Sequence, residues 1–392
     1  MLKGKNVVLG VTGGIAAYKA ADIASRMRKL GINVNVIMTK GATQFVTPLT
    51  LQSISQNYVV TDMFEDPKTW DVEHIALAKK ADVFLIAPCT ANVIGKINAG
   101  IADDMLTTTL MATKAPVLIA PAMNTNMYEN PITQRNIESL KELGYNFVAP
   151  AFGRLACGDT GAGKLEDTEI IVERTVDLLL RSDKLKGKKV LVTAGPTIED
   201  IDPFRYITNN SSGKMGYALA RVALQMGAEV TLVTGETHIK TPSAVNVIQV
   251  RSSEDMYKAV MEHSDVDYIF KAAAVSDYTP KDKSDIKVKK SSDDLTIELA
   301  RTIDILSELG NNKKNQILVG FAAETNDIID YAKEKIKKKN LDYIVVNDIS
   351  KAGAGFKSDT NIVSVIDKDG NISESGLLSK LDIAKFIIDT IL

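Results

Sequence analysis

The stretch TNNSSGKMG, residues 208–216, contains residue types that could bind an anion. Two serines, a glycine and a lysine come directly before a helical pattern, and the backbone N–H groups at the start of a helix attract negative charge. The stretch is not a P-loop, because that motif needs an earlier glycine and a final hydroxyl, and Met215 stands in the hydroxyl's place. A plain helix cap is the simpler interpretation, so the loop alone does not identify an anion.

Polar and small residues also follow the apolar runs of the first half, where strands should end. Thr39 follows VNVIM, PCTAN (88–92) follows DVFLIA, and PAMNTNMY (121–128) follows VLIA. Open parallel sheets bind ligands at the carboxyl ends of their strands, so these groups predict a ligand site. Taken alone, Asn124 is more typical of a helix N-cap and Met127 of a core.

Strand and helix patterns alternate along both halves, which predicts an α/β fold with two doubly wound, Rossmann-like sheets, the first of them flavodoxin-like. In the first half we expect strands at 5–11, 33–38, 82–87, 116–120 and 145–148, and helices at 14–30, 103–112 and 131–143. In the second half we expect strands at 188–193, 229–233, 266–270, 316–320, 342–346 and 361–367, and helices at 214–226, 253–262, 327–339 and 378–392.

The chain begins a domain twice. KNVVLGVTGG (5–14) and KKVLVTAGPT (188–197) are both short strand patterns that end in a glycine turn. A helical stretch and the polar sequence SDKLKG (182–187) separate the halves, so we predict domains at 1–183 and 187–392. Neither opening has the G-x-G-x-x-G spacing, which makes simple NAD binding a weak hypothesis.

The composition indicates a globular protein of ordinary polarity. The chain has 392 residues, 45% of them hydrophobic and 24% charged, with a net charge of −2 that gives no general attraction to nucleic acid. No apolar run is long enough to span a bilayer, and no export signal precedes the first strand, so we expect a cytoplasmic protein. Two cysteines, Cys89 and Cys157, are too few for a disulfide framework.

Four motifs of the first half carry a family resemblance. TGGIAAYK, the stretch around His74, PAMNTNMY and GRLACGDTGAGKL (153–165), in that order, resemble the flavin-dependent phosphopantothenoylcysteine decarboxylases. The resemblance implies that FMN is lined by Gly13, Gly14, Thr39, Thr90, Asn92 and Ala122. It also implies a catalytic His74 at the flavin, Asn124 on the substrate carboxylate, Met127 at the substrate, and a catalytic Cys157 on a closing flap.

Each of these residues also has a plain interpretation. Alone, His74 would be a structural histidine and Cys157 a small hydrophobe, although a cysteine between glycines is expected on a loop. Two residues depart from the family pattern: Cys89 replaces an alanine and is expected to be buried, and Lys164 replaces an arginine and loses its fork of donors.

The implied chemistry explains why a flavin is needed. A carboxylate on a saturated carbon has nowhere to place the electrons that departing carbon dioxide leaves behind. Oxidation of the carbon that carries the thiol supplies that electron sink, and the hydride is returned afterwards, so the overall reaction is redox neutral. A mobile thiol such as Cys157 would supply the proton.

The second half resembles phosphopantothenate–cysteine ligases over residues 187–392. The resemblance rests on five segments in order, and the order of the two halves resembles the fused bifunctional enzymes of coenzyme A synthesis. The segments are GPTIEDIDPFRYITNNSSGKMG (195–216), KAAAVSDY (271–278), IKVKK (286–290), GFAAET (320–325) and KIKKKNLDYIVVND (335–348).

The ligase resemblance implies that a carboxylate is activated by a nucleotide and then captured by cysteine. A catalytic Asn209 would lie near the acyl group, and a catalytic Lys287 would neutralise the triphosphate, with Asp277 helping to hold Mg²⁺. The implied substrate residues are Arg205, Asn210, Ser211, Ser212, Gly213 and Lys214. The implied nucleotide residues are Ala272, Ala273, Ala274, Asp277, Lys287, Phe321, Lys335 and Lys339.

Several alternatives stay open. The family uses CTP, giving an acyl-cytidylate, but the residues themselves do not exclude ATP. A flavin prenyltransferase-like domain joined to a dehydrogenase would share the fold, and so would a flavin-binding regulatory subunit without catalysis. The resemblance also implies trimeric decarboxylase contacts and dimeric ligase contacts, hence a large homo-oligomer such as a dodecamer, with no nucleic-acid or membrane partner.

Overall fold

The structure is a computed structural model. It describes residues 2–64, 73–155, 158–242, 245–288, 296–324, 328–348 and 358–392. For residues 323, 324, 328–331 and 348 it describes the backbone only. The chain divides into two compact units, Met1–Leu180 and Arg181–Leu392. The expected linker packs on the second unit, because Ser182 N donates to Gln225 O and Leu185 N donates to Met226 O, both at 2.8 Å.

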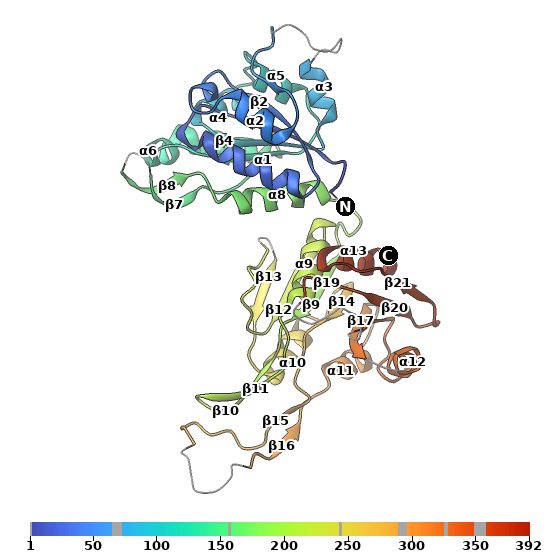
Figure 1. Ribbon diagram of the computed structural model, residues 1–392. Coiled ribbons are helices and arrows are strands. Elements are labelled where there is room, and N and C mark those ends of the chain that lie inside the picture. Colours follow the sequence, from blue (N-terminus) through green and yellow to red (C-terminus); the bar gives the residue numbers. More distant parts are fainter. Residues whose placement is uncertain are drawn as a thin grey trace. The chain divides into compact units, whose positions relative to one another are not determined.

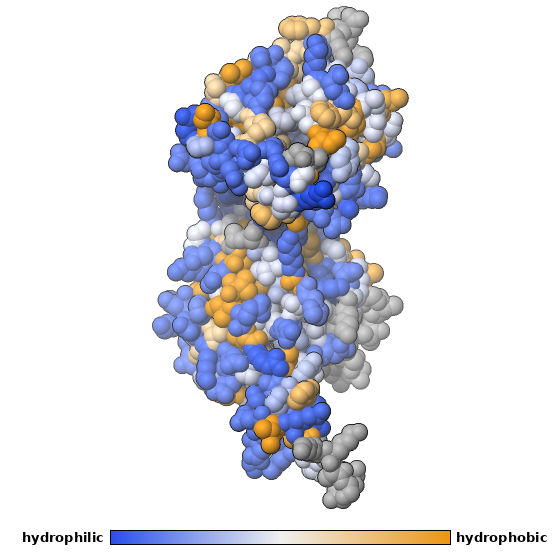
Figure 2. Space-filling model, turned by 90° about the vertical axis from the view of Figure 1, so that its left-hand side faces the viewer, coloured by the Kyte–Doolittle hydropathy of each residue, from blue (hydrophilic) through white to orange (hydrophobic). Residues whose placement is uncertain are grey.

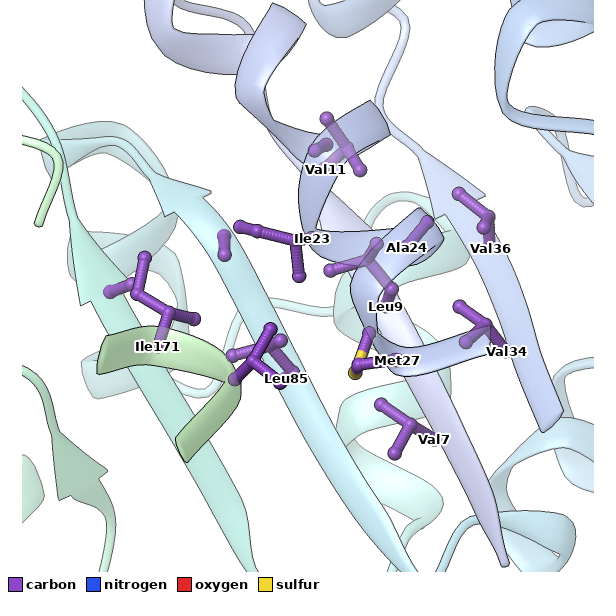
Figure 3. Packing of buried hydrophobic residues seen from close by; sticks show 14 of the residues in the cluster. Val7, Leu9, Val11, Ile23, Ala24, Met27, Val34, Val36, Leu85 and Ile171 are labelled. Carbon is purple, nitrogen blue, oxygen red and sulfur yellow. The ribbon is translucent and has the colours of Figure 1, made fainter. Parts of the chain in front are cut away.

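The first unit is built on a six-stranded parallel sheet with the order β3-β2-β1-β4-β5-β6. Alternate residues of β1 enter two different cores: Val7 and Leu9 face one layer of helices, and Val8 faces the other. Figure 3 shows the first core, where Met27 of the helix α1 packs beside Val7, Leu9 and Val34. The strands are β1 (Asn6–Val11), β2 (Asn33–Met38), β3 (Val59–Val60), β4 (Val83–Cys89), β5 (Val117–Pro121) and β6 (Asn146–Phe147).

Helices cover both faces of this sheet, as the parallel connections require. The helices α1 (Lys19–Lys29) and α8 (Thr168–Leu180) lie side by side on one face (Figure 1). The other core receives residues of α4 (Ala91–Asn98), α5 (Met105–Ala112) and α7 (Pro131–Glu142). Further elements are η1 (Ile15–Tyr18), η2 (Ala42–Gln44), α2 (Pro48–Ser55), α3 (Glu73–Lys80) and α6 (Thr125–Glu129).

The second unit repeats this plan on a larger sheet with the order β13-β12-β9-β14-β17-β18-β20-β21. The pairs from β13 to β18 are parallel, and β20 and β21 add an antiparallel edge. The strands are β9 (Lys189–Ala194), β12 (Glu229–Thr234), β13 (Asn246–Gln249), β14 (Tyr268–Lys271), β17 (Ile317–Glu324), β18 (Tyr343–Asp348), β20 (Val363–Asp367) and β21 (Ile372–Glu374). The predicted fold class is confirmed in both units.

Two cores again lie on the two faces of the sheet. One contains residues of α9 (Lys214–Gln225) and α13 (Lys380–Ile391). The other contains residues of α10 (Ser253–Glu262), α11 (Ile305–Asn311) and α12 (Ile328–Lys338). A short antiparallel pair, β19 (Thr360–Asn361) with β22 (Leu378–Ser379), leads into α13.

Three hairpins are additions that the strand–helix alternation did not predict. In the first unit, β7 (Ala151–Arg154) pairs with β8 (Thr160–Lys164). In the second unit, β10 (Ile198–Asp202) pairs with β11 (Arg205–Thr208), and β15 (Tyr278–Pro280) pairs with β16 (Leu299–Arg301). Figure 1 shows these last two hairpins projecting from the main sheet of their unit.

The strand orders locate the ligand sites. Strand order reverses between β1 and β4 in the first sheet and between β9 and β14 in the second. In open α/β sheets, ligands bind outside the carboxyl ends of the strands at this switch point. On the face shown in Figure 2, hydrophilic residues cover most of the surface and hydrophobic ones gather in small groups. Within the described ranges, no helix has the length and apolar character to cross a bilayer.

Candidate functional site

A cavity of about 1090 Å³ opens at the switch point of the first sheet. It lies where β1 and β4 end, and the flap hairpin β7–β8 contributes to its wall. The structure brings into its lining all six residues expected to contact a flavin, together with two expected at the substrate. These residues are Gly13, Gly14, Thr39, Thr90, Asn92, Ala122, Asn124 and Met127.

Thr12 joins the two strand ends that form the floor. Its buried hydroxyl donates to Pro88 O at 2.8 Å and accepts from Thr90 N at 3.0 Å. Thr90 then caps α4 by accepting from Val93 N at 3.5 Å. The start of a helix is therefore held at the cavity, where its N–H groups favour a negatively charged ligand group.

Glycine is required at the opposite edge of the floor. A Cβ atom on Gly13 would lie 2.7 Å from the carbonyl carbon of Gly41, closer than carbon atoms approach. The turn after β1 therefore packs directly on the loop after β2, near Thr39, whose hydroxyl accepts from Ala42 N at 3.3 Å. A floor made of backbone and small side chains leaves room for a flat ring system, so the residues fit a flavin.

The flap hairpin docks through two further glycines. Met123 N donates to Gly163 O at 2.9 Å, and a Cβ atom on Gly163 would lie 2.4 Å from Met123 O. A Cβ atom on Gly161 would come within 2.6 Å of the side chain of Thr125. Glycine at both positions thus lets β8 lie against the segment that carries Asn124.

Asn124 is a helix N-cap and also faces the cavity. Its Oδ1 accepts from Asn126 N at 2.9 Å, which starts α6, and its Nδ2 donates to Asp159 Oδ2 at 3.0 Å. The interpretation as a cap is therefore right, and it does not exclude a role in binding. The cap fixes the amide so that its N–H groups point toward a carboxylate.

Besides Lys164, which the sequence analysis named, the lining contains charged residues that were not singled out from the sequence. Lys96 binds Asp103 at 2.7 Å, and this hydrogen bond raises the pKa of Lys96. Lys19 donates to Leu165 O at 3.4 Å, which links α1 to the end of the flap. Lys19 belongs to TGGIAAYK, so the motif already contained this signal, whereas Lys96 and Asp103 come together only in the fold.

The remaining catalytic candidates of this unit are placed differently. His74 lies in the first turn of α3, half-buried, and is not among the described residues that line the cavity. Cys157 lies outside the described residues. Cys89 is buried, as expected, and burial raises the pKa of its thiol far above the ordinary value.

The second switch point is formed by the ends of β9 and β14. Pro196 and Ala274 form an isolated parallel β-bridge, and Ala274 N donates to Gly195 O at 2.9 Å. Asn209 reaches the same place, because its Nδ2 donates to Ala274 O at 3.2 Å. Gly213 has φ +77°, and a Cβ atom there would lie 3.2 Å from Gly195 N. The NNSSGK loop is therefore held against the turn that follows the first strand.

Lys214 is the first residue of α9, and no side chain caps this helix. Its Nζ donates to Asp359 Oδ1 at 2.5 Å. Asn210 is exposed, Ser211 Oγ accepts from Gly213 N at 3.3 Å, and Ser212 is half-buried. The loop thus combines helix N–H groups, hydroxyls and one cation, which suits an anionic ligand.

The segment after β15 that carries Lys287 packs on the β10–β11 hairpin, which carries Arg205. Arg205 Nε donates to Asp202 Oδ2 at 3.0 Å, and its guanidinium also donates to Val288 O at 2.9 Å. Arg205 holds the pKa of the buried Asp202 carboxyl far below its ordinary value. Lys287 Nζ lies 4.8 Å from the centre of the Phe204 ring, a cation–π contact.

Lysines and aspartates gather on the α11–α12 face of the second sheet. Lys339, the residue after α12, has its Nζ 2.7 Å from Asp304 Oδ2, and Lys335 on α12 is half-buried. Both lysines and Asp304 act electrostatically on Lys271, the last residue of β14, and so does Asp277. The sequence reading missed Lys271, because it ended that strand one residue earlier.

The other nucleotide candidates line the same strand ends. Ala273 N donates to Thr193 Oγ1 at 3.1 Å, Ala272 and Phe321 are half-buried, and Asp277 is exposed. Across the described ranges, no group of three or more acidic, histidine or cysteine side chains is arranged to hold a metal by itself.

Two family models match the chain, one over each unit. The model described as "Flavoprotein" matches residues 1–180, and "DNA/pantothenate metabolism flavoprotein C-terminal domain" matches residues 185–392.

Curated relatives match both units at once. The chain is 51% identical over 395 residues to "Coenzyme A biosynthesis bifunctional protein CoaBC" of Bacillus subtilis (strain 168), covering 100% of this chain and 97% of the relative. It is 46% identical over 356 residues to "Cysteine/Cysteine sulfinic acid decarboxylase" of an unknown prokaryotic organism, covering 88% of this chain and 99% of the relative.

A solved structure is similar to part of the chain. "Crystal structure of the C-terminal Domain of Coenzyme A biosynthesis bifunctional protein CoaBC" is 46% identical, covers 54% of this chain and 96% of its own, and has a TM-score of 0.47. On the full-length match, the chain belongs to the family of coenzyme A biosynthesis bifunctional proteins, in which a flavoprotein decarboxylase half precedes a ligase half.

Proposed function

We propose that the first unit binds FMN in its cavity and decarboxylates the cysteine conjugate that the second unit makes. The observation that carries this proposal is that all six residues expected at the flavin line one cavity at the β1/β4 switch point. FMN bound there would supply a hydride acceptor for the carbon that bears the thiol and would return the hydride afterwards.

Within this cavity, Asn124 would hold the substrate carboxylate. Its Nδ2 already donates to the carboxylate of Asp159, which shows the chemistry that the amide can perform. Asp159 would give way to the substrate, and the flap would close over it through the glycine contacts of β8. We further propose that Cys157 donates the proton to the enethiolate and that His74 assists the oxidation, with Met127 packing on the substrate.

In the second unit, we propose that phosphopantothenate binds in the loop from Asn209 to Lys214. Arg205 and Lys287 would approach from the hairpin, and CTP would lie across the ends of β9 and β14, with Phe321 near its base. Asp277 would provide one ligand of a Mg²⁺ ion that also binds phosphate oxygens, an arrangement this ion commonly adopts.

The chain's groups would stabilise charge that develops on the phosphates. The carboxylate of phosphopantothenate attacks the α-phosphate, pyrophosphate leaves, and the amine of cysteine then displaces the nucleoside monophosphate. Lysines near the phosphates stabilise both steps, since buried cations interact strongly with developing negative charge. By family analogy we propose a homo-oligomer with trimeric decarboxylase and dimeric ligase contacts, in the cytoplasm.

The test supplies phosphopantothenate, cysteine and one nucleoside triphosphate at a time to the purified protein. We expect a yellow protein that releases carbon dioxide, phosphopantetheine and the monophosphate with CTP. A parallel reaction with free cysteine tests the activity in the name of the second relative. Carbon dioxide from free cysteine, with no use of any triphosphate, would contradict the bifunctional assignment.

Two variants separate the halves. Cys157→Ser should stop after decarboxylation and accumulate an oxidised enethiol product, whereas Cys89→Ala, which removes a buried thiol, should remain active. Asn209→Asp should block amide formation and spare decarboxylation, with Asn312→Asp at the exposed end of α11 as its control. Full turnover by Cys157→Ser or Asn209→Asp would exclude the role assigned to that residue.

A further inference from the structure

Lys271 occupies an unusual position for a charged side chain. It is the last residue of β14, beside Thr193 of β9 and Gly320 of β17, and is therefore at the switch point of the second sheet. The residue is only 9% exposed. Because Ile269 belongs to the core under α10, α11 and α12, strand alternation places the Lys271 side chain on that same face.

The charges around Lys271 do not neutralise it. Asp304 on α11 is already bound by Lys339 at 2.7 Å, and Lys335 adds another positive charge from α12. Asp277, the other nearby acid, is exposed. Among the residues that the structure describes, none forms a hydrogen bond or ion pair with the Lys271 ammonium.

This environment also changes the proton affinity of Lys271. Burial lowers its pKa to about 8, and repulsion by Lys339 and Lys335 acts in the same direction. Asp304 and Asp277 oppose the change. A buried ammonium without a counter-ion is costly, and proteins normally pair such a charge.

Comparison with Lys214 shows what is missing at Lys271. Lys214 also lies at a strand-end loop, but it is 37% exposed and is paired with Asp359. Close to Lys271 in sequence, the hydroxyl of Ser276 is buried and has no hydrogen-bond partner within the described part of the chain. Within the described part of the chain, Ser276 thus adds a buried hydroxyl without a partner to the segment that begins with Lys271.

We propose that Lys271 is a phosphate-binding residue of the ligase half, whose buried ammonium is neutralised by phosphate oxygens of the bound nucleoside triphosphate. The assignment rests on the proposed nucleotide site at the ends of β9 and β14. It adds to that site the Lys271 ammonium at the end of β14, on the face of the sheet that α11 and α12 cover. The same chemistry could come from the phosphate of phosphopantothenate, and the test separates these two sources.

The test measures binding directly on the full chain by calorimetry. With CTP and Mg²⁺, Lys271→Met should raise the Kd by roughly 100-fold, because removing one partner of a buried charge pair usually costs more than one tenfold step. Phosphopantothenate alone should bind with an unchanged Kd. The control is Lys258→Met on α10, an exposed lysine paired with Glu254, which should bind both ligands normally.

A second readout follows the proton. For the wild type, kcat/KM for CTP should fall as the pH rises through about 8, because Lys271 then loses its charge. In Lys271→Met, kcat/KM for CTP should not fall as the pH rises through 8. Lys271→Arg keeps its charge at all these pH values, so it should recover part of the affinity for CTP and also show no fall in kcat/KM. Far-UV circular dichroism and a cooperative urea transition show that each variant is folded. If Lys271→Met is not folded, Lys271→Gln replaces it.

Two outcomes would overturn the assignment. The first is a folded Lys271→Met that binds CTP as tightly as the wild type. The second is a variant that loses phosphopantothenate and keeps CTP, which would place the other substrate's phosphate here. Failure of the broader proposal looks different, because the wild type itself would then bind no nucleotide.

Discussion

Replacing Lys271 by methionine should stabilise the second unit when no nucleotide is present. The side chain is buried, and its pKa of about 8 compared with the ordinary 10.5 means that folding disfavours its ammonium form. At 1.36 kcal/mol for each pH unit, this difference corresponds to about 3 kcal/mol. Methionine fills similar space without a charge, so the free energy of unfolding should rise by about that amount at pH 7.

The gain should depend on pH in a definite direction. Below pH 8 the folded and unfolded chains both carry the proton, and the full cost of the buried charge is present. Between pH 8 and 10.5 the folded protein releases the proton first, so the wild type gains stability as the pH rises. The advantage of Lys271→Met should therefore shrink to about 1 kcal/mol at pH 10.

Urea titrations at pH 7 and pH 10, read by pulse proteolysis, can follow peptides of the second unit separately. With an m-value of about 2 kcal/mol/M, the midpoint of Lys271→Met should lie roughly 1–2 M higher at pH 7. Lys258→Met, which removes an exposed charge, should stay within about 0.5 kcal/mol of the wild type. Equal midpoints for Lys271→Met and the wild type at pH 7 would refute the reasoning. Saturating CTP should bring the two midpoints close together, because a 100-fold lower Kd gives the wild type about 2.7 kcal/mol more stabilisation by the ligand.

Further predictions concern glycines. Gly216→Ala should lower the free energy of unfolding by about 1–3 kcal/mol despite better helix propensity, because its Cβ would lie 2.5 Å from that of Ala194. Gly95→Ala on α4 meets only an ordinary 3.9 Å contact and should stabilise by up to about 1 kcal/mol; the opposite sign in urea titrations would contradict this comparison. Gly163→Ala, with a Cβ 2.4 Å from Met123 O and φ +128°, should keep the flap from docking and slow decarboxylation by about tenfold or more. Ligase turnover should be unchanged, and normal carbon dioxide release would show that docking of β8 is dispensable.

The parallel framework could be predicted from the sequence because each inner strand is a short apolar run. The expected strand at 33–38 is β2 with the same bounds, and the expected helix at 253–262 is α10 with the same bounds. Buried parallel strands have no polar face, so their limits coincide with the limits of hydrophobicity. The family predicted from the order of the motifs is likewise confirmed, and the prenyltransferase-like and regulatory alternatives are not favoured.

The hairpins escaped prediction because their sequences resemble loops. IEDIDPFRYIT forms β10 and β11, yet some partners of its acidic residues lie far along the chain: Arg251 binds Asp200, and Val288 N donates to Asp202. The strand β8 was also not predicted, because two of its five residues are glycines, which are typical of loops. Both cases depend on tertiary contacts that local propensity does not contain.

The candidate site was predictable where a motif follows a strand and unpredictable where charges converge from separate elements. Gly13, Thr90 and Ala122 each follow a strand, and the fold brings them together at one cavity. The group around Lys271 draws on four separate segments, and a single lysine at the end of an apolar run gives no sign of it. The roles assigned to individual residues stay predictions until the variants are measured.

The burial of Cys89 has a practical consequence. The chain has two cysteines, and this one is enclosed between sheet and helices with its thiol held in the unreactive protonated form. A thiol-directed dye added to the native protein would therefore test whether Cys157 is accessible, with little background from Cys89. Comparing the labelling with and without a substrate analogue would test the role proposed for Cys157 without any engineered reporter.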